Sequence, residues 1–110
     1  MLIPAPMETL ARLEQTIRDR RSASTDASYV ASLLARGLPT IVRKLGEESV
    51  ETVIAALSGS REDLVGEAAD LLFHLMVLLS VKDIPLSDVL AELDKREGTS
   101  GLAEKASRSA

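Results

Sequence analysis

The sequence predicts an all-α protein, and three observations support this fold class. Apolar residues recur at helical spacing along nearly the whole chain, and no segment alternates apolar and polar residues with the β-branched and aromatic enrichment of a half-buried strand. Helix-capping residues separate the apolar stretches. The 110 residues, of which 45% are hydrophobic and 27% charged, have the size and balance of one soluble globular domain.

The first two helices are expected on either side of a polar linker. An amphipathic helix is predicted from Met7 to Arg21, and the linker covers residues 22–26. Ser28 is the expected N-cap of a short second helix, which ends at Gly37 because glycine readily adopts the left-handed conformation of a helix end.

A helical hairpin is predicted next. The third helix covers about residues 39–58, since the proline at its start is tolerated in a first turn, and it ends at Gly59. Ser60 and Asp63 have the spacing of a capping box that begins a fourth helix, which runs to about Lys82.

The C-terminal part is predicted to be a helix followed by a tail. A short amphipathic fifth helix follows Pro85 and ends before Gly98. We therefore expect a single all-α domain in residues 1–96 and a small, polar and flexible tail in residues 97–110.

The fourth helix is apolar around its whole circumference between Leu64 and Val81, and such a helix must be surrounded by other protein. The four other helices of one chain offer too little surface to cover it. We therefore predict a homodimer whose interface uses this helix and completes the core. The alternative is that one five-helix bundle buries the fourth helix completely.

Composition excludes several classes of function. Without cysteine the chain has no disulfide, thiol nucleophile or thiolate zinc site, and its only histidine, His74, cannot form a histidine-rich metal centre alone. A net charge of −4, with one Tyr and one Phe, argues against nucleic acid as a partner. The most apolar stretch, residues 71–81, is shorter than the ~20 residues that cross a bilayer, and the N-terminus lacks a signal-peptide pattern. We expect a cytoplasmic protein with no membrane partner.

Acidic residues form two groups on the predicted hairpin. Glu47, Glu48 and Glu51 lie in the third helix, and Glu67 and Asp70 lie in the fourth. Both groups stand about 12 Å from the connecting turn at 1.5 Å per residue, so antiparallel pairing of the helices places them level with each other.

Three features disfavour the alternative that these acids are only solvated surface charges. Glu47 and Glu51 form a like-charge i,i+4 pair, which destabilises a helix. The acidic face of the fourth helix becomes apolar one turn further along. Gly46 and Gly66 each precede an acidic group although glycine costs about 1 kcal/mol relative to alanine inside a helix, so a packing or ligand-approach role is expected for both.

Carboxylates at this density repel one another by about 3 kcal/mol for each pair at about 6 Å and an effective dielectric constant of ~20. Oxygen ligands without thiols suit Mg²⁺, with Mn²⁺ as an alternative, and such ions bridge to substrate phosphates. The expected ligand is therefore a polyphosphate. Lys44 and Arg43 adjoin the acids and are the candidate substrate-binding residues. His74 is interpreted as a core histidine paired with a neighbour or, alternatively, as a hydrogen-bonding group behind the site.

Two segments resemble a known family. The pattern KLGEExxE at residues 44–51 and EAADLLFHL at residues 67–75 resemble the ExxE…ExxD signature of the all-α, MazG-like nucleotide pyrophosphohydrolases. Within that superfamily, residues 28–29, 33–37 and 88–93 are most similar to the phosphoribosyl-ATP pyrophosphohydrolases of histidine biosynthesis. The resemblance covers about residues 8–96.

The resemblance implies a MazG-like bundle of four to five helices that hydrolyses 1-(5-phosphoribosyl)-ATP to 1-(5-phosphoribosyl)-AMP and pyrophosphate, the second step of L-histidine biosynthesis. The expected metal ligands are Glu48, Glu51, Glu67 and Asp70. Glu47 is expected to be a further ligand or the base that takes the proton of the attacking water, so that the predicted catalytic set is Glu47 with Glu48 and Glu51.

Two alternative functions remain at this point. A house-cleaning pyrophosphohydrolase of free (d)NTPs would share the metal site but not the substrate pocket. A non-enzymatic helical dimerisation module would carry the same acids as solvated charges.

Overall fold

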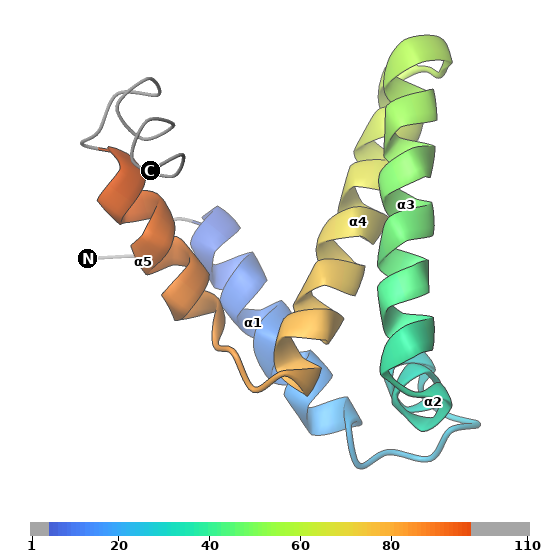
Figure 1. Cartoon of the computed structure of the whole chain (residues 1–110), viewed down its shortest axis with the longest axis vertical. Coiled ribbons are helices and arrows are strands. Elements are labelled where there is room, and N and C mark those ends of the chain that lie inside the picture. The colour runs from blue at the N-terminus through green and yellow to red at the C-terminus, as the bar shows by residue number, and fades with distance from the viewer. Residues whose placement is uncertain (1–4, 98–110) are drawn as a thin grey trace, which may run out of the picture.

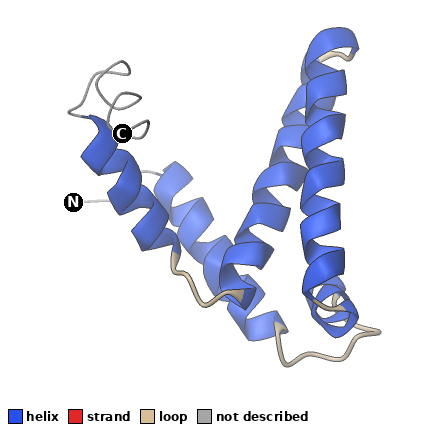
Figure 2. Ribbon diagram, in the orientation of Figure 1, coloured by secondary structure: helices blue, strands red, loops and turns tan. Residues whose placement is uncertain are grey.

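The computed structural model describes residues 5–97, with side chains from Glu8 onward. The tail predicted in residues 97–110 lies, apart from Glu97, outside the described residues. Helices and short connections make up the described part of the chain, which contains no strand (Figure 2). The all-α fold class is confirmed.

Five helices follow one another along residues 5–97, and each lies within two residues of its predicted bounds. They are α1 (Ala5–Arg20), α2 (Tyr29–Arg36), α3 (Leu38–Ser58), α4 (Arg61–Val81) and α5 (Leu86–Glu97).

The capping residues act as the sequence predicts. The Ser28 hydroxyl accepts a hydrogen bond from the Ala31 amide at 3.2 Å, and Gly37 ends α2 with a φ of 94°. Ser60 and Asp63 exchange the two hydrogen bonds of a capping box, at 3.0 and 3.1 Å, and so begin α4. The turn at Gly59 is therefore short, and it fixes α3 and α4 as a hairpin.

The helices form two arms that diverge from a common base (Figure 1). The antiparallel pair α3 and α4 makes one arm, α1 and α5 make the other, and α2 lies at the foot of α3. The Glu14 carboxylate accepts a hydrogen bond from the Leu86 amide at 2.7 Å, which ties the start of α5 to α1. The acidic segments of α3 and α4 therefore face each other within one arm.

The core lies at the base, where α1, α2, α3 and the second half of α4 meet. Its most buried side chains come from all four helices: Ile17, Val30, Leu33, Ile41, Met76 and Val77. Large aliphatic side chains at these positions hold the lower half of the hairpin in place.

The five helices of one chain leave part of α4 uncovered. Leu64, Val65 and Leu72 are 37%, 56% and 48% exposed. The alternative of complete burial within one five-helix bundle is therefore wrong. The predicted partner of α4, a second copy of the chain, remains a prediction.

Among the described residues, α4 alone has the length and apolar composition of a bilayer-spanning helix, with a mean hydropathy of 1.8 over 18 residues. Core helices of soluble proteins have the same properties. Within one chain 17% of this 18-residue window is buried, and Glu67 and Asp70 lie within the helix.

Candidate metal centre

The hairpin brings three of the predicted acids together. Glu48 of α3 and Glu67 and Asp70 of α4 each offer a carboxylate oxygen, and these oxygens lie within 4.8 Å of one another. Glu48 is only 8% exposed. The level placement predicted from equal distances along the two helices is therefore observed for these three residues.

Thr52 contacts both acidic segments at once. Its hydroxyl lies 2.8 Å from the carbonyl oxygen of Glu48, one turn earlier in α3, and 3.2 Å from the carbonyl oxygen of Glu67 in α4. A hydroxyl carries a single proton, so the two carbonyls share one donor. This contact joins the helices at the level of the acids.

The acids at the centre of the group have unsatisfied oxygens. The Oε2 atoms of Glu48 and Glu67 are buried and have no hydrogen-bond partner. A buried, unpaired carboxylate oxygen is costly unless it is protonated or binds a cation. Three closely spaced carboxylates from two helices, without thiols or imidazole among the ligand atoms, suit a hard divalent ion such as Mg²⁺ or Mn²⁺.

The pKa values of these carboxyls reflect the same unfavourable environment. Burial raises the pKa of Glu48, and the neighbouring carboxyl of Glu51 raises it further. Burial also raises the pKa of Glu67, and the charge of Glu51 adds to that effect. Without a cation, these two carboxyls bind protons more readily in the folded chain than in the unfolded chain.

Glu51 lies beside this group rather than inside it. Its carboxyl is close enough to Glu48 and Glu67 to raise the pKa of both. Together with Glu67 and Asp63 it lines a cavity of about 410 Å³ at the end of the hairpin near Gly59. This volume is within the range of small-molecule sites, about 300–1,000 Å³.

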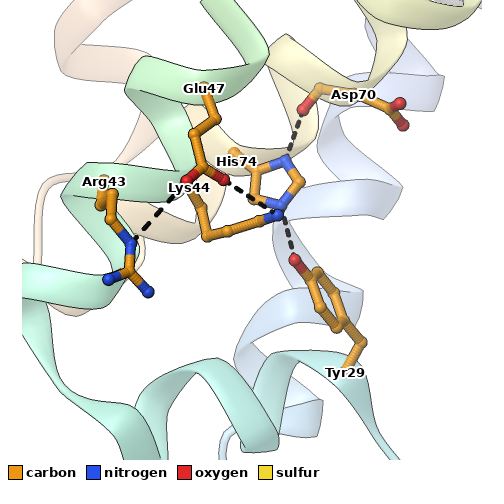
Figure 3. A network of polar contacts seen from close by, with 6 residues as sticks. All are labelled: Tyr29, Arg43, Lys44, Glu47, Asp70 and His74. Carbon is orange, nitrogen blue, oxygen red and sulfur yellow. Dashed lines mark hydrogen bonds and ion pairs between the residues drawn. The ribbon is translucent and has the colours of Figure 1, made fainter.

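Glu47 lies on the side of α3 that carries the basic residues. Its carboxylate is 3.3 Å from the Lys44 ammonium and 3.8 Å from Nε of Arg43, and it is half exposed (Figure 3). The hydrogen bond from Lys44 to Glu47 raises the pKa of the lysine, and the phenol of Tyr29 contributes to the same shift. The predicted base and the two predicted phosphate-binding residues therefore form one charged cluster.

His74 is a core histidine with both ring nitrogens hydrogen-bonded (Figure 3). Its Nδ1 atom lies 2.7 Å from the carbonyl oxygen of Asp70, and its Nε2 atom lies 2.9 Å from the hydroxyl of Tyr29. The carbonyl can only accept, so Nδ1 donates; in the neutral imidazole Nε2 then accepts the tyrosine proton. Both interpretations made from the sequence describe part of this arrangement, because the paired core histidine also contacts a candidate ligand residue.

The space that a side chain would occupy at each of the two glycines before the acidic groups is empty. A Cβ atom added to Gly46 or Gly66 would have no neighbour within 4 Å. Within one chain, therefore, neither glycine is required by packing. The expected packing or ligand-approach role would have to come from outside the described chain.

Thr52 and Tyr29 were not among the residues singled out as functional from the sequence. Thr52 stands one turn after Glu48, so helical periodicity alone could have placed it on the same side of α3. Tyr29 contacts His74 across 45 positions of sequence, and no local pattern signals such a pair.

Comparison with known proteins gives one consistent result. The family described as phosphoribosyl-ATP pyrophosphohydrolase matches residues 10–97 of the chain. A phosphoribosyl-ATP pyrophosphatase of Novosphingobium aromaticivorans is 69% identical over 102 residues, which are 93% of this chain and 95% of that protein. Proteins of the same name from Rhizorhabdus wittichii and Erythrobacter litoralis are 66% and 64% identical, over 91% and 93% of this chain and 94% and 98% of their own lengths.

Proposed function

The chain belongs to the phosphoribosyl-ATP pyrophosphohydrolase family, and on this premise we propose that it hydrolyses 1-(5-phosphoribosyl)-ATP with divalent cations held by its two acidic helices. Water adds to a phosphoanhydride, the bond between the α- and β-phosphates breaks, and 1-(5-phosphoribosyl)-AMP and pyrophosphate leave. This is the second step of L-histidine biosynthesis. As a hydrolase of this pathway the chain is expected to act in the cytoplasm.

The buried Glu48 carboxylate carries the proposal. Its Oε2 atom lacks a partner, as does Oε2 of Glu67, and ligand oxygens of Glu48, Glu67 and Asp70 lie within 4.8 Å of one another. We assign these three residues and the adjacent Glu51 as ligands of Mg²⁺, for which Mn²⁺ is an alternative. When bound, such an ion neutralises phosphate charge and lowers the pKa of the attacking water.

The charged cluster on the other side of α3 is assigned to binding the substrate phosphates and to accepting the proton of the attacking water. Lys44 and Arg43 would hold phosphate oxygens, which compete with Glu47 for their positive charges. Glu47, released from these two ion pairs, would then be able to accept the proton of the attacking water. Its half-exposed position is consistent with contact to water.

The quaternary structure is proposed to be a homodimer. The exposed apolar residues of α4 need a cover, and α3 exposes a further apolar face. We call the outer α3 face the surface formed by Val42, Gly46, Val50, Val53 and Leu57, which fall within an arc of about 80° at 100° per residue. Its four large side chains are between 49% and 83% exposed. Nucleic acid and membranes are not expected as partners.

Release of pyrophosphate from phosphoribosyl-ATP, with and without Mg²⁺, tests the function. Release is expected only with Mg²⁺, and the variants Glu51→Gln and Asp70→Asn are expected to abolish it while they remain folded by circular dichroism. Glu62→Gln is the matched control, because it removes a carboxylate from α4 outside the acidic group. Activity that survives in both ligand variants would contradict the assigned site.

A panel of dNTPs assayed in parallel tests the substrate. The family membership predicts faster turnover of phosphoribosyl-ATP than of any dNTP. A dNTP preference would instead support the house-cleaning activity, and no turnover of either substrate would support a non-enzymatic dimerisation module.

A further inference from the structure

We propose that the ring of Tyr29 is the platform on which the purine of the substrate stacks. This assigns a specificity-determining contact for the nucleotide base. The acids and the basic residues of α3 are assigned only to the metal ion and the phosphates. The inference rests on the proposed function, because that function supplies a ligand with an adenine ring.

The rings of the chain are gathered at one place. The sequence contains one Tyr, one Phe, one His and no Trp. Tyr29, Phe73 and His74 contact one another, with ring centroids 6.0, 5.7 and 5.2 Å apart. The core consists otherwise of aliphatic side chains. Phe73 packs against the core and His74 is buried, so two of the three rings are held in place by the core.

Tyr29 differs from its two neighbours because it faces solvent. His74 is 5% exposed, whereas Tyr29 is 48% exposed although it is the largest of the three side chains. The tyrosine is nevertheless fixed at both ends. Its hydroxyl donates to Nε2 of His74 at 2.9 Å, and its ring stacks on Phe73 with an interplanar angle of 26°. An exposed ring that is already immobilised loses little conformational entropy when a ligand binds to it.

Tyr29 lies near both the acidic group and Lys44. His74 hydrogen-bonds to the Tyr29 hydroxyl and to the backbone carbonyl of Asp70, and the Lys44 ammonium is within electrostatic range of the phenol. Figure 3 shows Asp70, His74 and Tyr29 in this order, with the Asp70 carboxylate pointing away from His74. A nucleotide bound with its phosphates at the acids and Lys44 would extend its base toward the tyrosine.

The chemistry of the ring fits a purine. A purine offers a large flat π-face, and stacking of a base on an aromatic side chain is favourable whichever base is present. Tyr29 would thus add affinity for the base without reading its hydrogen-bonding edge. Groups elsewhere would have to distinguish the N1-ribosylated adenine from other purines.

The chain provides its own reporter for a direct test. Because Tyr29 is the only tyrosine and tryptophan is absent, all tyrosine fluorescence of the protein comes from this residue. Titration of the Mg²⁺-loaded wild-type protein with the product 1-(5-phosphoribosyl)-AMP is expected to quench this fluorescence, whereas titration with pyrophosphate, which has no base, is not. Free tyrosine amide in the same solutions corrects for absorption by adenine.

Two variants separate the ring from its hydroxyl. Tyr29→Leu removes the ring and is expected to raise KM for phosphoribosyl-ATP about tenfold, with a smaller change in kcat. Tyr29→Phe keeps the ring and is expected to change KM less than about threefold. Urea unfolding of both variants shows that they are folded under assay conditions.

Two results would overturn the inference. One is the absence of quenching at a concentration of the AMP compound that calorimetry shows to be saturating. The other is an equal rise of KM in the two variants, which would assign the effect to the hydrogen bond with His74. Failure of the proposed function is distinguishable, because the wild-type protein would then release no pyrophosphate, whereas the fluorescence titration does not depend on turnover.

Discussion

The hydroxyl of Thr52 lies 3.2 Å from the carbonyl oxygen of Glu67, and this contact connects the two helices that carry the candidate metal ligands. The same hydroxyl is 2.8 Å from the carbonyl oxygen of Glu48. One side chain thus touches the backbone of a ligand residue on each helix. We therefore expect it to help set how far α3 is shifted along α4, and with that shift the separation of the acids.

Replacing Thr52 by valine is expected to weaken both the hairpin and the metal site. Valine keeps the shape but lacks the donor, so the free energy of unfolding should fall by about 1 kcal/mol, the net contribution of one hydrogen bond. The Mg²⁺ concentration for half-maximal activity should rise as well. Thr52→Ser keeps the hydroxyl and serves as the control. Equal Mg²⁺ dependence in the wild type and Thr52→Val would show that Thr52 does not position the ligands.

The stability of the metal-free protein is expected to decrease as the pH rises above the ordinary glutamate pKa of 4.5. The pKa values of Glu48 and Glu67 are raised in the folded state, mainly by burial. Between the ordinary and the raised values the folded chain binds more protons than the unfolded chain, so the free energy of unfolding falls with pH.

Thermal unfolding in EDTA across this pH range measures the effect. Glu48→Gln removes one of the two carboxyls, so its stability should depend less on pH, and saturating Mg²⁺ should reduce the dependence in the wild type because it favours the ionised carboxylates. Glu62→Gln, outside the acidic group, is expected to follow the wild-type curve. A Glu48→Gln curve parallel to that of the wild type would contradict the assigned cause.

Loss of the Tyr29 hydroxyl is expected to destabilise the fold through His74. In Tyr29→Phe the buried Nε2 atom of His74 has no donor, and an unsatisfied buried acceptor costs about 1–3 kcal/mol. Because Tyr29 is half exposed and water can partly replace its hydroxyl, we expect a loss of about 1 kcal/mol in urea unfolding.

A double-variant cycle tests this explanation. When His74 is also replaced by phenylalanine, both polar partners are absent, and the loss should be smaller than the sum of the two single losses. Strict additivity would show that the two side chains do not interact in solution.

The helices could be predicted because their ends are determined locally. The Ser28 cap and the capping box of Ser60 and Asp63 depend on residues three positions apart, and the sequence contains them directly. The level placement of the acids followed from the short turn at Gly59. In both cases the physical cause lies within a few residues of its effect.

The parts of the site that could not be predicted depend on tertiary packing. Glu47 and Glu48 are neighbours in sequence and were placed in one acidic group, but only Glu48 is buried against α4, whereas Glu47 pairs with Lys44. Which of two adjacent positions faces the neighbouring helix depends on the rotation of α3 about its axis. That rotation is determined by distant contacts such as those of Ile41 in the core. For the same reason the sequence indicated α4 as the surface in need of a partner, whereas Leu57, on α3, is 83% exposed.

The homodimer can be tested with a charged substitution on the outer α3 face and a control outside it. Val53→Asp places a charge among exposed apolar residues and is expected to shift a dimer to monomer in sedimentation velocity. Ser87→Asp adds the same charge on α5, outside this face, and should leave the sedimentation coefficient unchanged.

Gly46→Ala distinguishes a packed outer α3 face from a solvated one by the sign of its effect. Gly46 lies at the middle of that face, and an added Cβ has no neighbour within 4 Å in one chain. In a monomer the substitution should therefore stabilise α3 by about 1 kcal/mol, the difference in helix propensity between glycine and alanine. If a second copy packs closely there, the methyl group meets the partner, and dimer dissociation should become easier although the helix itself is more stable. Stabilisation with an unchanged dissociation constant would place the dimer interface elsewhere, since a glycine that no chain approaches has no packing role in α3.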